Sequence, residues 1–244
     1  MTELGGRVAL VTGAGRRVGR ALAVALGARG MHVLVHYNAS SDGADETARL
    51  VTRAGGSAEV FRADLAVVAE AERMVDQLVA TRGALDVLVN SAALMLRTPV
   101  GETSVTDWDA MFALNVRATY FLSQRAAPAL RASRGSIINI ADLAAFETWP
   151  AYVPYGMTKA AVVQMTRALA RVLAPEIRVN AIAPGVVLLP EGWSEADAEH
   201  LRGTTPLRRL GAPEDVVGAM LYLLDAGYVT GEVLTVDGGR HVRS

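Results

Sequence analysis

Short apolar runs alternate with longer helical patterns along the whole chain, and this alternation limits the possible folds more than any other feature. The expected strands are Val8–Thr12, His32–His36, Ala58–Arg62, Val87–Asn90, Ile137–Ala141, Arg178–Ile182 and Val233–Val236. The expected helices include Gly19–Arg29, Asp45–Arg53, Ala69–Arg82, Trp108–Arg131 and Lys159–Leu173. Near-continuously apolar runs are typical of parallel strands buried on both faces. Right-handed crossovers between them predict an α/β fold: one doubly wound parallel sheet of about seven strands, with a binding crevice at the carboxyl ends of the strands.

Composition narrows the class of protein. The 244 residues include no cysteine, which excludes disulfides and thiolate metal sites. The formal net charge is −1 and the charges are mixed along the chain, which argues against a nucleic-acid or acidic-membrane surface. No metal site is expected, because the four histidines are not spaced along the chain as metal ligands usually are; they are His32, His36, His200 and His241. The N-terminus does not resemble a signal peptide and no apolar stretch approaches the ~20 residues of a membrane span, so we expect a cytoplasmic protein.

A glycine-rich segment, TGAGRRVG at residues 12–19, directly follows the first apolar run and leads into a helical pattern. Gly13 and Gly15 permit a tight turn with the backbone close to a ligand, and Gly19 permits close packing of the helix on the sheet. The helix N-terminus then offers amide donors and a positive dipole end to a pyrophosphate. Because the segment follows the first strand of a parallel sheet, a Rossmann-type nucleotide site is favoured over a plain turn.

The end of the second strand indicates which nucleotide binds. An Asp or Glu there would hold the ribose 2′-OH of NAD, but the chain has His36-Tyr37-Asn38-Ala39-Ser40. The guanidinium groups of the glycine-rich segment could reach a 2′-phosphate, or they could be solvated turn charges. The sequence therefore predicts NADPH (or NADP), held in this region by Arg16, Arg17, Val18, His36, Tyr37, Asn38 and Ser40.

Two further strand ends fit the same cofactor. Asp64 can accept a hydrogen bond from the adenine amino group, and Leu65 can cover the ring. Asn90, Ser91 and Ala92 end the fourth strand with small residues that let the backbone lie along the adenosine half. Each of these segments could also be an ordinary turn after a strand.

A carboxylate, a phenol and an ammonium come together in IINIADLAAFETWPAYVPYGMTK, residues 137–159. Asp142 follows an apolar run, Tyr155 comes thirteen residues later, and Lys159 lies one helical turn further. An ammonium near a phenol stabilises the phenolate and moves its pKa toward the working pH. A Tyr and a Lys four residues apart on a helix are otherwise ordinary surface neighbours.

Over essentially its whole length the chain resembles a classical short-chain dehydrogenase/reductase. The resemblance rests on TGAGRRVG, NSAA, Asn115 in MFALNVRATYF, Tyr155-x-x-x-Lys159, RVNAIAPG and VTGEVLTVDGG. It implies that Tyr155 is the acid/base, that Lys159 binds the nicotinamide ribose and lowers the Tyr pKa, and that Asn115 holds the helix geometry and a water. It also implies cofactor contacts from Tyr155, Lys159, Pro184, Gly185 and Val186, one domain over residues 1–244, and a substrate-covering segment at about 186–210.

Asp142 departs from this family, which has its catalytic Ser thirteen residues before the Tyr. Pteridine reductases carry Asp there and Arg at the place of Arg17, and the chain further resembles bacterial dihydromonapterin and dihydrofolate reductases. This branch implies hydride transfer to a pterin C=N bond, with Asp142 as a second acid if burial raises its pKa. One alternative is a generic reductase of 3-oxoacyl or sugar ketones, in which Asp142 only replaces the Ser. Another is a regulator that binds NADP(H) without catalysis.

The substrate side is less defined. Met95 stands where pteridine reductases place a stacking aromatic, and a Met can also lie against a flat ring. Trp193 is a candidate lid contact or a helix anchor, and Trp149 could wall the pocket or only pack. The apolar surplus on Trp108–Arg131 and Lys159–Leu173 resembles the helix pairs of a homotetramer, although a wide core face would also explain it.

Overall fold

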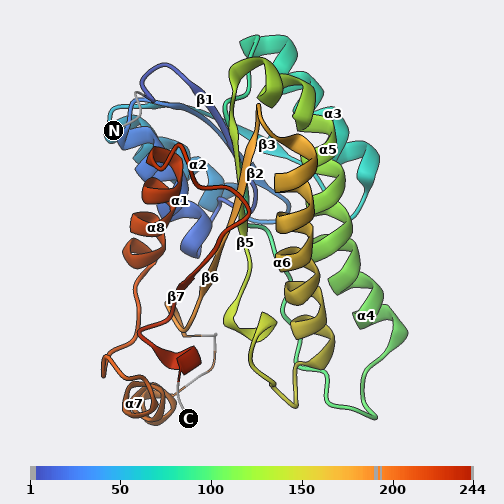
Figure 1. The fold of residues 1–244 in the computed structure, drawn as a ribbon, viewed down its shortest axis with the longest axis vertical. Coiled ribbons are helices and arrows are strands. Elements are labelled where there is room, and N and C mark those ends of the chain that lie inside the picture. The colour runs from blue at the N-terminus through green and yellow to red at the C-terminus, as the bar shows by residue number, and fades with distance from the viewer. Residues whose placement is uncertain (1–3, 190–191, 193, 243–244) are drawn as a thin grey trace.

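The computed structural model describes residues 4–189, 192 and 194–242, which form a seven-stranded parallel sheet in the order β3-β2-β1-β4-β5-β6-β7. The predicted single-domain, doubly wound α/β fold is confirmed (Figure 1). The strands are β1 Val8–Val11, β2 His32–Tyr37, β3 Ser57–Arg62, β4 Val87–Asn90, β5 Ser136–Ile140, β6 Arg178–Pro184 and β7 Val233–Val236.

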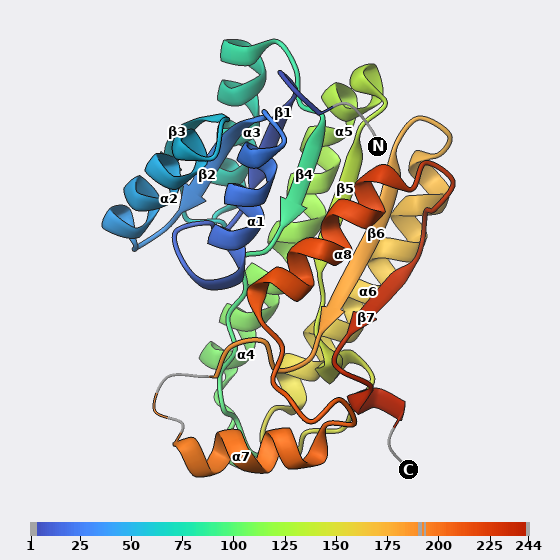
Figure 2. The same ribbon diagram turned by 90° about the vertical axis from the view of Figure 1, so that its left-hand side faces the viewer.

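Helices cover both faces of the sheet. The helices are α1 Arg17–Ala28, α2 Ser41–Arg53, α3 Val68–Arg82, α4 Val105–Phe112, α5 Thr119–Ser133, α6 Val153–Leu173, α7 Glu195–Thr204 and α8 Pro213–Asp225. Helices α1, α2 and α8 lie on one face, and α3, α5 and α6 lie on the other (Figure 1). Helix α7 lies apart from both layers, at the end of the molecule where β6 and β7 finish (Figures 1 and 2). None of these helices is long and apolar enough to cross a membrane.

The two outer strands differ from the expectation of burial on both faces. Strands β1, β4 and most of β5 and β6 are buried, whereas β3 alternates between exposed and partly buried positions and β7 is partly buried throughout. Strand β3 has one neighbour, β2, and β7 has one neighbour, β6, so each is an edge. Polar residues fit such an edge: Glu59 of β3 accepts a hydrogen bond from Arg82 at 3.0 Å.

The expected single helix Trp108–Arg131 is interrupted. Helix α4 is followed by a π-helical turn, Ala113–Ala118, and only then by α5. Wide turns of this kind often occur at functional sites. Here the turn carries Asn115, whose side chain bonds the backbone of Leu94 in a neighbouring segment. Helix α6 also differs from the expectation, because it begins at Val153 and thus includes Tyr155 as well as Lys159.

Parallel pairing brings the carboxyl ends of the strands to one edge of the sheet. Asn90 pairs with Asn139, and Pro184 pairs with Val236 in the register of the neighbouring strands. The segments after β1, β4, β5, β6 and β7 therefore meet at this edge, near α7 (Figure 2).

Candidate active site

His36 lies beneath the glycine-rich turn between β1 and α1. Its Nδ1 accepts a hydrogen bond from the Gly13 amide at 3.0 Å, so the proton is on Nε2, which donates to the Ala63 carbonyl at 3.0 Å. Burial lowers the pKa of His36 to about 4, which keeps the ring neutral. Its side chain is buried with both nitrogens bonded, so His36 supports the turn, and its contact with the cofactor stays a prediction.

The glycine-rich turn packs tightly against the end of β4. The Thr12 hydroxyl accepts hydrogen bonds from the amides of Ser91 and Ala92 at 2.9 and 3.0 Å. A Cβ on Gly13 would lie 2.9 Å from the Ala92 Cα, and a Cβ on Gly19 would lie 2.4 Å from the Gly13 carbonyl oxygen. These positions therefore require glycine. Thr12 was missed in the sequence, although it is the residue just before the first glycine.

The N-terminus of α1 is suited to an anion. In the part of the chain that the structure describes, Arg16 precedes the helix without capping it, and the first turn contains no acid. The first-turn amides and the positive end of the helix dipole can therefore bind a phosphate. Val18 packs against the core beside this turn.

Arg17 does not point where the sequence suggested. Its backbone has φ +54°, a conformation that favours glycine. Its guanidinium donates to the carbonyls of Leu188 at 3.2 Å and Leu189 at 3.3 Å, beyond the end of β6. Arg17 thus bridges the glycine-rich turn to the segment after β6, and both Arg16 and Arg17 are exposed.

The end of β2 places Tyr37, Asn38 and Ser40 beside the turn. The Asn38 carbonyl accepts a hydrogen bond from Arg62 at 3.2 Å, and Ser40 precedes α2. No acid follows β2 before Asp42, as the sequence shows. Their contact with a 2′-phosphate stays a prediction.

The segments after β3 and β4 differ in part from the expectation. Asp64 accepts a hydrogen bond from Ala66 N at 3.0 Å and remains available at the strand end. Leu65 is buried in the core, so its side chain does not cover a ligand there. Asn90 also points inward, donating to Asn139 at 2.9 Å and Ser123 at 3.2 Å. Cofactor contacts of Asn90, Ser91 and Ala92 stay a prediction.

The segment after β6 borders the same edge. Pro184 ends the strand, the Gly185 amide donates to Val236 at 2.9 Å, and the Val186 carbonyl accepts from Gly211 at 2.9 Å. A Cβ on Gly185 would lie 2.8 Å from the Asp237 side chain, so glycine is required by close packing.

Asp142, Tyr155 and Lys159 meet between the end of β5 and the first turns of α6. The Tyr155 hydroxyl bonds Asp142 Oδ2 at 2.9 Å, and Asp142 Oδ1 accepts from Ala144 N at 2.8 Å. Lys159 Nζ donates to the Ile140 carbonyl at 2.9 Å and lies 5.7 Å from the centre of the Tyr155 ring. The three side chains predicted to act together therefore form one cluster.

Burial controls the charges in this cluster. It raises the pKa of the Asp142 carboxyl, against the opposing effect of the Lys159 ammonium. Burial also raises the pKa of Tyr155 well above its usual value, and the Asp142 carboxylate adds to this. Burial lowers the pKa of Lys159 to about 8. The direction of the Tyr155 pKa is therefore opposite to the expected lowering, because the phenol is buried and, in addition, contacts the Asp142 carboxyl directly.

Asn115 ties the segment after β4 to α6. Its side chain accepts from Leu94 N at 2.8 Å and donates to Leu94 O at 2.9 Å and to the Thr158 hydroxyl at 3.0 Å. These contacts fix the start of the segment that carries Met95, whose side chain is 38 % exposed. A water between Asn115 and Lys159 stays a prediction, and Trp193 lies outside the described residues.

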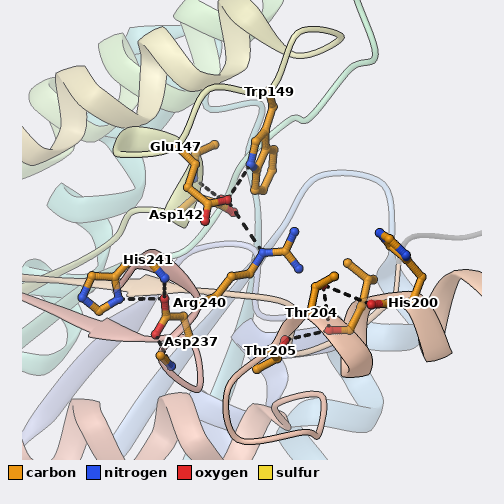
Figure 3. Close-up of polar contacts among 12 residues, drawn as sticks. Asp142, Glu147, Trp149, His200, Thr204, Thr205, Asp237, Arg240 and His241 are labelled. Carbon is orange, nitrogen blue, oxygen red and sulfur yellow. Dashed lines mark hydrogen bonds and ion pairs between the residues drawn. The ribbon is translucent and has the colours of Figure 1, made fainter. Parts of the chain in front are cut away.

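Two charged residues near Asp142 were missed in the sequence. Glu147 accepts a hydrogen bond from Trp149 Nε1 at 3.0 Å, and Arg240 Nε lies 3.7 Å from the same carboxylate oxygen (Figure 3). Trp149 itself packs against the cluster that contains Tyr155. Arg240 comes soon after the last strand. Because the carboxyl ends of parallel strands meet, its place near Asp142 could have been predicted from the sequence.

Comparison with known proteins agrees with this geometry. Residues 13–241 match the family described as Enoyl-(Acyl carrier protein) reductase, and the solved structure of a short-chain dehydrogenase/reductase from Serratia marcescens BCRC 10948 superimposes with a TM-score of 0.93. That structure is 36% identical, covering 98% of this chain and 100% of its own. This chain belongs to the short-chain dehydrogenase/reductase family.

Two relatives of this short-chain dehydrogenase/reductase are named for ketone reduction. A protein of Streptomyces violaceoruber, named as ketoacyl reductase 2 of the granaticin polyketide synthase, is 38% identical over 96% of each chain. A 3-oxoacyl-[acyl-carrier-protein] reductase of Synechocystis sp. is 35% identical over 98% of each chain. The chain is therefore an oxidoreductase with a nicotinamide-binding fold, and these relatives do not support the pteridine reductase branch expected from the sequence.

Proposed function

We propose that this chain reduces the ketone of a 3-oxoacyl thioester with hydride from NADPH. The observation that carries the proposal is the 2.9 Å contact between Tyr155 and Asp142, at the strand edge that also holds the glycine-rich turn. A proton donor thus lies beside a nucleotide-binding turn. The ketoacyl and 3-oxoacyl relatives supply the substrate class.

The residues at the strand edge fit the cofactor. The α1 N-terminus would hold its pyrophosphate, the backbone after β4 and β6 would border it, and Lys159 would bind the nicotinamide ribose. When bound, the cofactor supplies the hydride. NADPH is favoured over NADH because an acid is missing from the end of β2 and the glycine-rich turn carries an exposed Arg16.

Asp142 determines where the Tyr155 proton points. While Asp142 is ionised, the Tyr155 hydroxyl donates to it and is turned away from a substrate. When Asp142 is protonated, its own O–H can donate to the Tyr155 oxygen, which frees the phenol proton for the substrate oxygen. After the phenol has given up that proton, Asp142 can replace it. The burial that raises the Asp142 pKa favours this productive state.

Oxidation of NADPH with a 3-oxoacyl thioester tests this proposal. We expect turnover in the parent protein and loss of turnover in Tyr155→Phe, with NADPH binding retained. Arg49→Gln is a control, since it removes an exposed ion pair with Glu46 on α2, away from the site. NADPH binding without turnover of any ketone or pterin would contradict this proposal. It would favour the alternative in which the chain is a regulator that binds NADP(H) without catalysis.

A second candidate is reduction of a pterin C=N bond, favoured by the buried carboxyl of Asp142 at the position where the family has a Ser. A buried, protonated carboxyl can supply a proton to a ring nitrogen, and Met95 could lie against the pterin. Asp142→Asn would then nearly abolish turnover of a dihydropterin, because the amide keeps the shape without the acidic proton. Turnover of the dihydropterin alone, with none of the thioester, would favour this candidate over the first.

We also propose that the chain forms a homotetramer through helices on the α5–α6 side. Exposed apolar side chains there include Tyr120, Met157 and Val172. Light scattering should give four times the 25.7 kDa mass of one chain, and a monomer would contradict the proposal.

A further inference from the structure

A second carboxylate, Glu147, shares one short turn with Asp142. Asp142 precedes the 3-10 turn Leu143–Ala145 and caps it through Ala144 N. The Glu147 amide then donates to the Leu143 carbonyl at 3.0 Å, which closes the turn. The two acids thus lie at the two ends of a single bonded unit, and Figure 3 shows their side chains next to each other. Burial is the main cause of the raised pKa of Asp142, and the Glu147 carboxylate adds a smaller effect in the same direction.

Glu147 is held from two sides. Trp149 Nε1 donates to Oε2 at 3.0 Å, and the indole packs edge-on against Tyr152 with 6.2 Å between ring centres. Arg240 Nε lies 3.7 Å from the same oxygen, an ion-pair distance that is too long for a hydrogen bond. The side chains of Glu147 and Arg240 are only 21% and 14% exposed, so solvent screens their charges weakly.

Arg240 is presented by an ordered turn. It begins the 3-10 turn Arg240–Val242 after β7, where Asp237 accepts from the amides of Gly239 at 2.9 Å and His241 at 2.6 Å. Asp237 also bonds the His241 ring at 2.8 Å. Figure 3 shows the Arg240 side chain reaching from this turn toward Glu147. A residue from the far end of the chain thereby enters the surroundings of Asp142.

We propose that Glu147 and Arg240 are positioning residues that together set the charge state of Asp142. A Glu147 carboxylate near Asp142 disfavours a second negative charge, and the Arg240 cation reduces that effect. Asp142 also faces Tyr155 and Lys159 of α6, so the protonated state depends on this whole set of groups. The catalytic consequence rests on the proposed function, because a protonated Asp142 frees the Tyr155 proton.

Direct titration of the Asp142 carboxyl by ¹³C NMR tests this inference without any substrate. The resonance is assigned by its loss in Asp142→Asn. Glu147→Gln keeps an acceptor for Trp149 and should lower the midpoint by about 0.5 pH unit or more, the order expected for one nearby charge. Arg240→Gln should raise it by a similar amount, and Arg240→Lys should restore it to within about 0.2 unit.

Glu176→Gln is a matched control. It breaks an ion pair with Arg131 that also spans 3.7 Å, near the amino end of β6 and away from the carboxyl ends where Asp142 lies. This variant should leave the Asp142 midpoint unchanged. An unmoved midpoint in both the Glu147 and Arg240 variants, or movement in the same direction, would overturn the inference.

If Glu147→Gln does not fold, the two Arg240 variants decide alone: Arg240→Gln must raise the midpoint and Arg240→Lys must not. The pH dependence of kcat should move in parallel with the NMR midpoint. If the variants shift the Asp142 midpoint as expected but the parent protein reduces no ketone, this inference stands and the proposed function is contradicted.

Discussion

Loss of the buried His36 side chain should destabilise the protein at neutral pH and remove part of its acid sensitivity. His36→Gln keeps an amide donor that can reach the Ala63 carbonyl but leaves the Gly13 amide without its acceptor. A buried donor left without a partner costs about 1–3 kcal/mol. The variant should therefore be less stable than the parent by about that amount at pH 7.5.

The pH dependence follows from the neutral state of the ring. Its pKa falls from 6.5 to about 4 on folding, so the folded state binds the proton less tightly than the unfolded chain. Stability from this group is present above pH 6.5 and is lost as the pH falls through 4. A shift of this size corresponds to about 3 kcal/mol, most of it lost by pH 4.5.

Urea unfolding of both proteins between pH 7.5 and 4.5 measures this effect. The parent should be more stable at pH 7.5, and the gap should close or reverse by pH 4.5, because only the unfolded parent gains a proton at position 36 that the folded protein binds less tightly. Other acids titrate equally in both proteins and cancel in the difference. A gap that stays constant over this range would refute a buried neutral His36.

Three further predictions concern the site itself. Tyr155→Phe should lower kcat by about 10²–10⁴-fold in steady-state assays without weakening NADPH binding, because it removes the proton donor. Arg16→Ala should reduce an NADPH-over-NADH preference of at least about tenfold, whereas Arg17→Ala should change both affinities alike in titrations, since its guanidinium bonds Leu188 and Leu189. Asp142→Asn should gain thermal stability over the parent as the pH rises above 3.8, because a carboxyl with a raised folded pKa loses stability as the pH rises through that pKa.

Much of the fold could be predicted because burial on both faces leaves a direct mark on the sequence. The central strands are continuous apolar runs, and the glycine-rich turn between β1 and α1 is dictated by close packing at Gly13 and Gly19. The edge position of β3 was not visible in the same way, because it depends on which strands pair. The π-helical turn around Asn115 was missed for a similar reason: it is accompanied by contacts to Leu94, a distant segment.

The chemistry of the site was predictable in kind but not in geometry. The spacing of Asp142, Tyr155 and Lys159 indicated that they would meet, and they do. The direction in which a side chain points cannot be predicted from its neighbours in the sequence. The sequence therefore predicted that Arg17 would reach a 2′-phosphate and that His36 would contact the cofactor. The pKa of Tyr155 depends on burial and on its direct contact with a carboxylate, which only the folded chain reveals.

The pH profile of kcat with NADPH and a 3-oxoacyl thioester tests most directly whether a protonated Asp142 frees the Tyr155 proton. In the parent protein, kcat should fall as the pH rises through the raised pKa of Asp142. Asp142→Ser replaces the acid with a hydroxyl, so the variant should keep turnover and lose this limb of the profile. The same falling limb in both proteins would contradict the account, since the titrating group would then not be Asp142.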